Sequence, residues 1–576
     1  MKKKLKEIKL EAFMILRERG LKMKKHNLFK VLGIMLVLVI ITSYFLPNRD
    51  GAMAYIGIMD VGMKLFQSLY YFFYVITFLF AVGAFYGVLN KTSAYKKLLD
   101  NIVAKVKPLG KKFIFLLIMI IAIIASFTGI TLPLVIFIPF VVAIILLIGY
   151  DKLVAITTTA GGIIVGYIGG VFVSFVNPNT GGVNTFETLV GLEAKFDNMF
   201  PKLLLLFAGI ALLITFVNTY ITAVEKKKVK YELTDDSELI VNEVNKDYKN
   251  IKIWPICAVL IWLFLMVVLG LFPWNALFGI TFFDEFHKIL IGLTIGDIII
   301  RLIIGGIVFG FVILIKWIIS LIRKNKFKFR VLLPIVSALV VLLVLEVLNT
   351  LDVCNLYNVS FMKTVDKFFS GNGFFDFVFL TNVISKDYLN AFGTWNTMGD
   401  SLGYLLMTAL LVVATGIVAL VNKVKFSEML DDSVNGMKKM LPTVGLIVVA
   451  YSLLIVAYTH GFFEGLVTGY GKFNYGVSGL LTFLGSLLTV DFYYIVVGVF
   501  SPIIGLITDE SVYSSVAIML QGIYGIFSLI GPSSLLLIFV LSYFDVSYTT
   551  WFKYVWRFIL GLIILLALVT ALVVLL

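Results

Sequence analysis

The chain has 576 residues, of which 60% are hydrophobic and only 14% charged, and its mean hydropathy is +1.02. A soluble protein of this length could not bury so much apolar surface, because the charged and polar residues would be too few to cover it. Apolar runs of about 20 residues recur from end to end, each long enough to span the hydrocarbon core of a bilayer. The composition therefore predicts an all-α polytopic membrane protein.

The net charge of +14 raises the question of a nucleic-acid partner. The basic residues lie mostly between apolar runs, where they indicate membrane orientation, so we expect no nucleic acid. Cys257 and Cys354 show no paired or metal-ligand spacing, and the three histidines are dispersed. We therefore expect no disulfide, no metal cluster and no cofactor. The lysine-rich loops share one face of the predicted topology, which places the N-terminus on the cytoplasmic side of the cytoplasmic membrane.

Residues 1–27 form a basic N-terminal segment with Leu5, Ile8, Phe13 and Leu16 on one side of a predicted helix. A cationic amphipathic helix of this kind binds the anionic inner surface of a membrane. A solvated basic tail that only sets the orientation is the alternative.

A first transmembrane repeat follows over residues 28–223. Its apolar stretch 113–150 is too long for one span, and its middle, SFTGITLP, carries turn-forming residues. We predict a re-entrant helical hairpin with Ser126, Thr128 and Thr131 at its polar tip. Irregular backbone is tolerated at membrane depth only where protein or a watered cavity surrounds it. Two full spans joined by a tight turn are the alternative, and they would reverse the orientation downstream.

An interrupted helix is predicted over residues 153–195, with helix up to the stretch FVNPNTGG. The proline removes a backbone donor and the two glycines favour an unwound chain. Unwinding frees carbonyl groups for a cation, and the N-terminus of the continuing half-helix attracts an anion. Asn177, Asn179 and Thr180 add neutral ligands for Na⁺ or for a carboxylate. A purely structural proline kink is the alternative.

Residues 224–252 form a hydrophilic cytoplasmic linker, and residues 253–400 form a middle transmembrane region with an extracytoplasmic segment. The second transmembrane repeat, 401–576, contains a predicted hairpin at 475–507 and a broken helix at 512–545. Small and polar residues mark the hairpin tip and the break, namely Ser486, Thr489 and Asp491 at the tip and Gly531, Pro532, Ser533 and Ser534 at the break.

The two repeats resemble each other. Residues 61–89 and 435–467 both contain Gly-Met-Lys near their start, continue as an apolar run and end in a patch of glycine and aromatic residues. Each is followed by an apolar pair, an interrupted helix and a closing span. In the predicted topology the two copies run in opposite directions. This is the pattern of an inverted repeat, in which substrate sites form from discontinuous helices near the bilayer midplane.

Three stretches resemble a known family: VGAFYGVLNKTSAY (82–95), GGIIVGYIGG with NPNTGGV (within 149–183) and QGIYGIFSLIGPSSLLL (521–537). The chain resembles members of the ion-transporter superfamily, especially YfcC-like and C4-dicarboxylate anaerobic carrier proteins. The resemblance implies that hairpin tips and helix breaks form the substrate and cation sites, and that a transport domain moves as an elevator against a scaffold. The hairpin tips SFTGIT and SLLTVD depart from the family pattern, so substrate and coupling ion stay open.

We therefore expect a secondary active transporter for a small polar organic solute, a carboxylate or an amino acid, coupled to Na⁺ or H⁺. Its expected partners are the solute, the lipid bilayer and a second copy in a homodimer. The expected substrate-binding residues are Ser126, Thr128, Asn177, Asn179, Thr180, Ser486, Thr489, Ser533 and Ser534. The expected Na⁺ ligands are Thr131, Asn177, Thr180, Gly531 and Ser533.

Two other functions are open at this point. A membrane-embedded enzyme that modifies lipid or polysaccharide would need a titratable group at an interface, and His460, Glu464 and Asp491 lie close enough in sequence to supply one. A channel is the other alternative. The chain contains no nucleotide-binding motif, which disfavours an ATP-driven pump.

Overall fold

The structure is a computed structural model. It describes residues 28–46, 55–128, 133–170, 174–176, 183–185, 199–227, 251–268, 403–468, 472–490 and 492–575. The chain divides into two compact units, and almost every described element belongs to the unit formed by Met1–Leu263 with Ser401–Leu576. The predicted basic segment 1–27, most of the linker and most of the region 253–400 lie outside the described residues.

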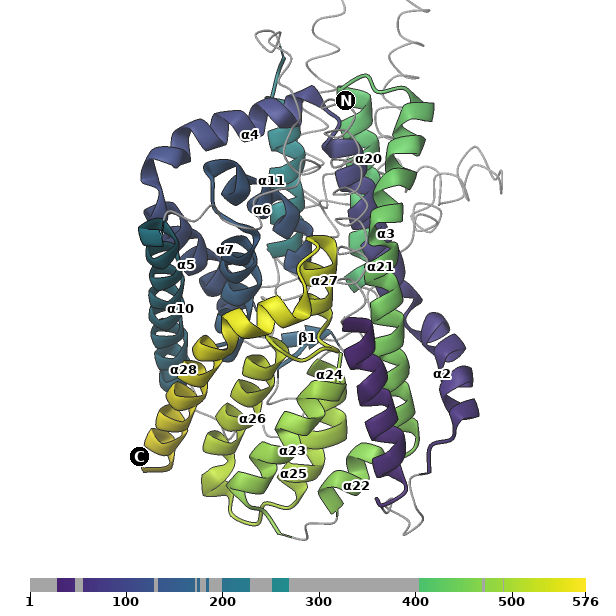
Figure 1. Cartoon of the computed structure of the whole chain (residues 1–576), viewed down its shortest axis with the longest axis vertical. Coiled ribbons are helices and arrows are strands. Elements are labelled where there is room, and N and C mark those ends of the chain that lie inside the picture. Colours follow the sequence, from purple (N-terminus) through teal and green to yellow (C-terminus); the bar gives the residue numbers. More distant parts are fainter. Residues whose placement is uncertain are drawn as a thin grey trace, which may run out of the picture. The chain divides into compact units, whose positions relative to one another are not determined.

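The first half is helical apart from one short pair of strands (Figure 1). A helix at Leu28–Ser43 precedes the labelled elements. These are α2 (Ile58–Tyr71), α3 (Phe73–Leu89), α4 (Ser93–Val106), η1 (Lys107–Leu109), α5 (Lys111–Thr128), η2 (Pro133–Phe137), α6 (Ile138–Ile148), α7 (Lys152–Ile156), the π-helix η3 (Thr157–Gly161), α8 (Gly162–Ile168), β1 (Ser174–Val176), β2 (Val183–Thr185), α10 (Met199–Lys227) and α11 (Trp254–Val268).

The described elements of the second half are all helices. Its elements are α20 (Gly403–Val421), α21 (Phe426–Thr459), α22 (Phe462–Thr468), α23 (Tyr475–Leu488), α24 (Phe492–Ile495), the π-helix η9 (Val496–Phe500), α25 (Ser501–Gly505), η10 (Glu510–Val512), α26 (Tyr513–Ser528), α27 (Leu535–Tyr543) and α28 (Tyr548–Leu575). Helix α21 starts well before its apolar part, because its amphipathic first turns pack on α3.

The helical membrane class is confirmed. Among the described residues, three helices are long and apolar enough to cross a bilayer: Phe200–Glu225, Phe426–Thr459 and Tyr548–Leu575. Two bent pairs raise this number to as many as five, namely α2 with α3, bent by 62°, and the α4–η1 helix with α5, bent by 109°. The second bend falls at Gly110, whose φ of +50° suits glycine.

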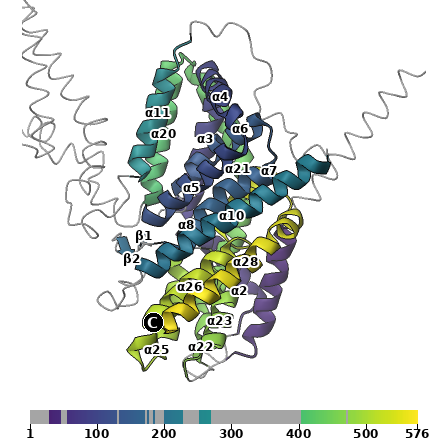
Figure 2. The same cartoon turned by 90° about the vertical axis from the view of Figure 1, so that its left-hand side faces the viewer.

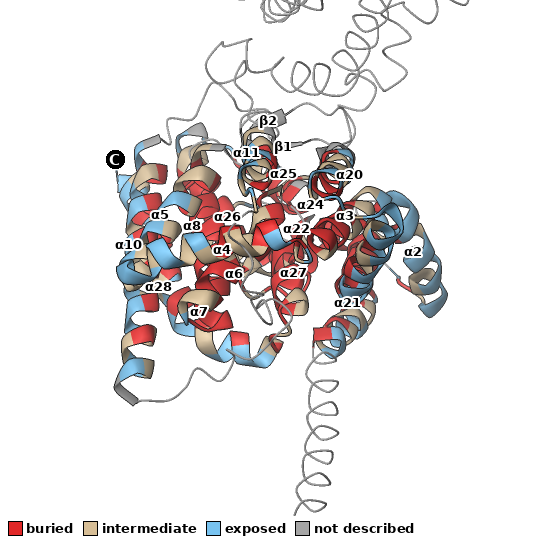
Figure 3. Ribbon diagram, turned by 90° about the horizontal axis from the view of Figure 1, so that it is seen from above, coloured by how far each residue is buried: buried red, intermediate tan, exposed pale blue. Residues whose placement is uncertain are grey.

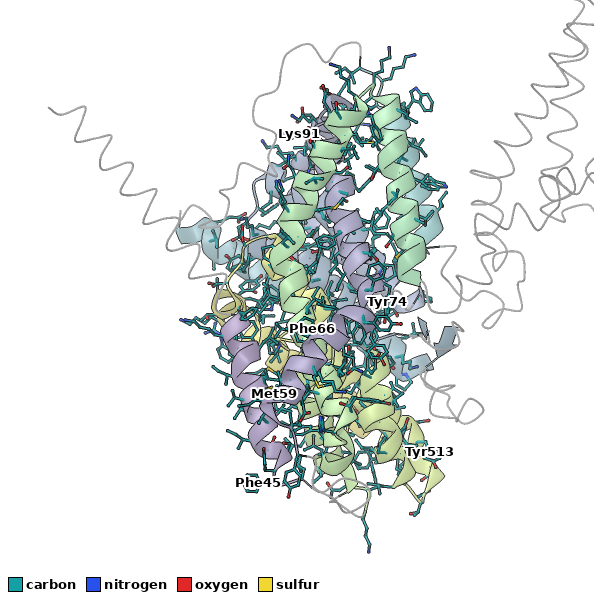
Figure 4. All side chains as sticks on the ribbon, turned by 90° about the vertical axis from the view of Figure 1, so that its right-hand side faces the viewer. Phe45, Met59, Phe66, Tyr74, Lys91 and Tyr513 are labelled. Carbon is teal, nitrogen blue, oxygen red and sulfur yellow. The ribbon has the colours of Figure 1, made fainter. Side chains whose placement is uncertain are left out.

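Apolar side chains cover the outer faces of several helices, as expected where lipid is the solvent. In α2, Met59 is 84% exposed and Phe66 is 73% exposed, and Figure 4 shows both side chains. Figure 3 shows exposed faces on α2, α10 and α28, and buried residues concentrated on α8, α26 and α27. The buried residues of the last group make the helices near the breaks the interior of this unit.

Helices from the two halves of the sequence pack against each other. Helix α3 packs on α21, α8 on α26 and α10 on α28 (Figures 1 and 2). At the α3–α21 crossing, a Cβ added to Gly83 would lie 2.7 Å from the carbonyl oxygen of Gly436. Glycine is required there because only glycine lets two helix backbones approach so closely. At the α10–α28 contact, the rings of Phe216 and Phe558 stack with centroids 5.4 Å apart.

The helix predicted to continue through Val176 ends at Ile168, so this part of the prediction is wrong. Residues Ser174–Val176 form β1, which pairs antiparallel with Val183–Thr185 in β2. A Cβ added to Gly169 would lie 2.5 Å from Leu206 Cα in α10, so the chain can pass α10 there only because the residue is glycine. The β-branched and aromatic residues of VFVSFV then favour an extended chain.

Candidate functional site

The tip of the second hairpin packs directly on the break between α26 and α27. The Ser533 hydroxyl, in the break, donates to the carbonyl oxygens of Leu487 at 2.6 Å and Thr489 at 3.2 Å. A Cβ added to Gly531 would lie 3.2 Å from the carbonyl oxygen of Ser486. The break therefore binds the last turn of the hairpin's first arm through a hydroxyl and a glycine contact.

Two side chains of α28 satisfy the carbonyl groups of this second break. The Trp551 indole Nε1–H donates to Leu529 O at 2.7 Å, and the Tyr548 hydroxyl donates to Ile530 O at 2.6 Å. The last carbonyls of a helix have no partner within the helix, and Pro532 cannot supply an N–H. These donors compensate for the missing helical bonds, so the unwound segment is stable in an apolar environment.

The carbonyl groups at the end of α8 are satisfied from two directions. The Ser126 hydroxyl, near the end of α5, donates to Gly169 O at 2.7 Å. The Gln521 amide Nε2, in α26, donates to Tyr167 O at 2.9 Å. The end of α8 is therefore bonded both to α5 of its own half and to α26 of the opposite half of the protein.

Aromatic rings bring the end of α8 together with the second hairpin and α26. The Tyr167 ring centroid lies 5.4 Å from that of Phe492 and 5.9 Å from that of Tyr524. The Phe492 and Tyr524 centroids are 5.4 Å apart, so the three rings contact one another. A Cβ added to Gly525 would lie 2.5 Å from Ile168 Cγ1. The end of α8, the second hairpin and α26 thus meet at one aromatic cluster.

A π-helix with three buried threonines precedes α8. The hydroxyls of Thr157 and Thr159 donate to the carbonyls four residues earlier, at 2.7 and 2.9 Å. The Thr158 hydroxyl is buried and has no hydrogen-bond partner within the described part of the chain. This π-helix contacts α27, which follows the second break. Single π-turns inside α-helices occur frequently at functional sites, because they disturb the regular backbone bonding.

A buried carboxylate caps the start of α7, the helix that continues into this π-helix and α8. Asp151 is 1% exposed and accepts hydrogen bonds from the Val154 N–H at 2.8 Å and the Tyr220 hydroxyl at 2.7 Å. Burial raises the pKa of the Asp151 carboxyl, although these bonds oppose the rise. The hydroxyls of Thr157 and Tyr554 are hydrogen-bonded at 3.3 Å, which links the helix to α28. These contacts position the helix that leads to the first break.

The structure places the predicted site residues in two groups. Ser486, Thr489, Gly531, Ser533 and Ser534 lie at the junction of the second hairpin with the second break, and Ser126 lies at the end of α8. The hydroxyls of Ser486 and Thr489 donate to carbonyls of their own helix, which leaves their oxygen lone pairs as acceptors. The side chain of Thr128 and the residues Thr131, Asn177, Asn179 and Thr180 lie outside the described residues.

Sequence reasoning missed four side chains that complete these junctions: Tyr167, Gln521, Tyr548 and Trp551. Tyr167 and Gln521 lie in glycine-rich stretches that the sequence marks, GGIIVGYIGG and QGIYG. Their pairing joins residues 354 positions apart and depends on the tertiary structure. Trp551 carries no local signal, because an apolar helix gives no reason to single out one aromatic residue.

The residues considered for metal or enzyme chemistry are placed as follows. In this part of the chain, no group of three or more histidine, cysteine or acidic residues is arranged to bind a metal ion. His460, a candidate for an enzyme site, lies 4.0 Å from Asp60 of α2, and the side chains of Glu464 and Asp491 lie outside the description. The groups gathered at the breaks are neutral hydroxyls, amides and carbonyls, which have the chemistry to donate hydrogen bonds to a solute or accept them from it.

Comparison with known proteins gives one family. Residues 24–328 match the family model described as C4-dicarboxylate anaerobic carrier (DcuC), which is more than half of the chain. No curated protein and no solved structure matches significantly.

Proposed function

The chain belongs to the C4-dicarboxylate anaerobic carrier family, a family of membrane transporters and not of enzymes, and from this premise we propose its substrate, site and mechanism. The protein is a secondary active transporter of C4 dicarboxylates in the cytoplasmic membrane, with its N-terminus in the cytoplasm. Na⁺ or H⁺ drives it. Neutral oxygen atoms at the breaks favour Na⁺, which prefers hard oxygen ligands.

The observation that carries this proposal is the junction of Ser533 with the hairpin tip at Leu487 and Thr489. The helix α27 starts at Leu535, directly after this junction, so its free N–H groups and positive dipole end lie beside it. A carboxylate is an acceptor-only ligand that such a helix start stabilises. The substrate therefore binds between hairpin tip and break, and the predicted ligands from Asn177 to Thr180 complete the site from the first half.

Two inverted repeats, 28–223 and 401–576, build this site in our proposal. Its support is the mutual packing of corresponding helices, α3 with α21, α8 with α26 and α10 with α28. The two halves also share one internal contact. Helix α5, the first arm of the first predicted hairpin, packs on α8, and α23, the first arm of the second, packs on α26. Transporters with such repeats place the substrate where the repeats meet.

Transport follows an elevator mechanism in a homodimer. One group of packed helices, α2, α3, α20 and α21, forms the scaffold, and the hairpins with α8, α10, α26, α27 and α28 form the moving body. The hydroxyls of Thr443 in α21 and Ser542 in α27 are hydrogen-bonded across the proposed boundary. This bond must break during each cycle, whereas the Ser68–Ser452 bond, 3.0 Å long within the scaffold, need not.

Counterflow in proteoliposomes tests the function. We expect an internal C4 dicarboxylate to drive uptake of a labelled one. Ser533→Ala should reduce this uptake by about tenfold or more, because the hairpin tip and the start of α27 would no longer be aligned for one carboxylate of the substrate. Thr415→Val is the matched control, since Thr415 is buried and bonds only to Leu411 of its own helix. The absence of exchange for every dicarboxylate tried, or ion currents far above carrier rates, would refute the carrier proposal.

Paired cysteines test the mechanism. In a variant that lacks Cys257 and Cys354 and retains transport, oxidation of a Thr443→Cys, Ser542→Cys pair should stop exchange, and a reductant should restore it. The control pair Ser68→Cys, Ser452→Cys should cross-link without effect on exchange. Unchanged transport in the first pair, with cross-linking verified by mass spectrometry, contradicts a moving boundary between α21 and α27.

A further inference from the structure

The amide of Gln521 has an orientation that its hydrogen bond determines. Its Nε2 lies 2.9 Å from the carbonyl oxygen of Tyr167, at the end of α8. A carbonyl oxygen can only accept, so the amide must direct its NH₂ group to Tyr167. The other edge of the amide is therefore the oxygen Oε1, which can only accept. Because both atoms share one carbon, Oε1 also lies at the end of α8.

This oxygen is buried and lacks a donor. Gln521 is 1% exposed, and no donor in the described part of the chain bonds to Oε1. An unpaired acceptor in an apolar interior is unfavourable, so the position favours a ligand that supplies a donor. Helix α26, which carries Gln521, leads to the second break, and the Gln521 amide bonds to Tyr167 at the first break. The unpaired oxygen therefore belongs to a side chain that contacts both breaks.

The surroundings of this amide restrict the chemistry of that donor. Gln521 precedes Tyr524 by three residues on the same helix, and its amide bonds to the backbone of Tyr167. Tyr167, Tyr524 and Phe492 form the aromatic cluster described above. Faces of aromatic rings attract cations, and a carbonyl-type oxygen beside them accepts from the same cation. An ammonium group satisfies both features, whereas a carboxylate, which only accepts, satisfies neither.

We propose that Gln521 determines specificity by receiving the ammonium group of a 2-amino C4 dicarboxylate on its Oε1, beside the rings of Tyr167 and Tyr524. This inference rests on the proposed function, because it assumes a dicarboxylate site at the breaks. The two carboxylates bind as in any C4 dicarboxylate, and the ammonium adds a charged hydrogen bond. A 2-hydroxyl group supplies a donor without the charge and therefore ranks between an amino and an unsubstituted substrate.

A ligand series tests the proposal without any variant. Competition against a labelled C4 dicarboxylate in proteoliposomes should rank aspartate before malate and malate before succinate. A charged hydrogen bond contributes enough for about a tenfold difference between aspartate and succinate. N-acetylaspartate retains both carboxylates and loses the ammonium, so it should lose this advantage. Equal inhibition by aspartate and succinate, while succinate is exchanged normally, would overturn the proposal and leave the carrier function intact.

The variant Gln521→Leu removes the acceptor. We expect the aspartate-to-succinate ratio to fall by about tenfold while succinate exchange continues, and Thr415→Val to keep the ratio of the unmodified protein. Gln521→Met, which is unbranched, serves if the leucine variant does not fold. An unchanged ratio in a folded variant contradicts the assignment. So does a variant in which only the dependence on Na⁺ changes, because Oε1 would then be a ligand of the coupling ion.

Discussion

Each helix break is joined to a neighbouring helix by a hydroxyl group, and the two hydroxyls donate in opposite directions. In the first half, Ser126 of α5 donates to Gly169 in the break, and in the second half Ser533 in the break donates to Leu487 and Thr489 at the hairpin tip. Both bonds pair a free carbonyl at the end of a helix with a small hydroxyl. The two junctions therefore do not share a residue position. They share a physical requirement, because buried carbonyl groups need hydrogen-bond donors.

The breaks differ in where their other donors come from. Leu529 and Ile530 are bonded by Trp551 and Tyr548, which belong to the same half. The carbonyl of Tyr167 is bonded by Gln521 of the opposite half. The second break is therefore stabilised within its own half, whereas the first depends on contact between the halves. Four substitutions separate these contributions.

Gly169→Ala should have the largest effect on stability. The new Cβ would lie 2.5 Å from the backbone of Leu206, so α8 or α10 must shift, and we expect a loss of about 1–3 kcal/mol in the free energy of unfolding. Thermal unfolding in detergent measures it. Gly445→Ala in α21 is the control, because a Cβ at Gly445 meets no atom within 4 Å. Equal melting temperatures for the two variants would show that the first break tolerates movement away from α10.

Trp551→Phe tests the donors of the second break. The ring is retained, but the buried carbonyl of Leu529 loses its partner, which costs about 1–3 kcal/mol. We expect a lower melting temperature and slower exchange. Trp556→Phe is the control on the same helix, because Trp556 is 43% exposed. If both variants melt alike, the Trp551 indole N–H does not contribute to the stability of the break.

Ser126→Ala and Ser533→Ala compare the two hairpin junctions directly. Each removes a hydroxyl donor, at a cost of about 1 kcal/mol, and Ser533→Ala should cost slightly more because its single O–H lies within bonding distance of two carbonyls. In the double variant, independent junctions give additive changes within about 0.5 kcal/mol. A larger deviation, measured by chemical or thermal unfolding, would show that the breaks communicate through the bond between Gln521 and Tyr167.

The smallest expected effect is on the pH dependence of stability, and it concerns Asp151 before α7 and Asp509 before α26. Burial raises the pKa of Asp151, so its contribution to stability is present below the usual aspartate pKa of about 4 and is lost as the pH rises through the raised value. Asp151→Asn retains an N-cap acceptor. The stability of the unmodified protein relative to this variant should therefore fall as the pH rises from about 4.

At Asp509 the expected pH dependence of stability has the opposite sign. It precedes α26, is exposed, and has its pKa lowered by hydrogen bonds from Ser511. Its small contribution is present above the usual aspartate pKa and lost as the pH falls through the lowered value, so Asp509→Asn should show the reverse dependence. Melting temperatures measured from about pH 2 to about pH 7 test both residues, because the Asp509 effect lies below the usual aspartate pKa and the Asp151 effect above it. A parallel response of the two variants would contradict the assigned environments.

The second break shows how much of this site is readable from the sequence. A proline inside an apolar run cannot donate within a helix, so Gly531-Pro532 indicates an interruption, and the structure has one between Ser528 and Leu535. The first break shows the limit of that reasoning. Proline and asparagine drew attention to Asn177, but the helix already ends at Ile168, because Gly169 passes against α10. The residues that favour or interrupt a helix do not reveal where a neighbouring helix will lie, so the end of α8 at Ile168 could not be predicted from them.

The sequence is sufficient to identify a helical membrane protein, because apolar runs of membrane length have no alternative to intramolecular backbone bonding in lipid. It also marked the second break, since glycine and proline interrupt helices. The tertiary structure alone decided which donor reaches which free carbonyl. Ser126, Gln521, Ser533 and Trp551 are ordinary buried residues in sequence, and each acquires its role only when folding brings it within 3 Å of an unpaired backbone oxygen.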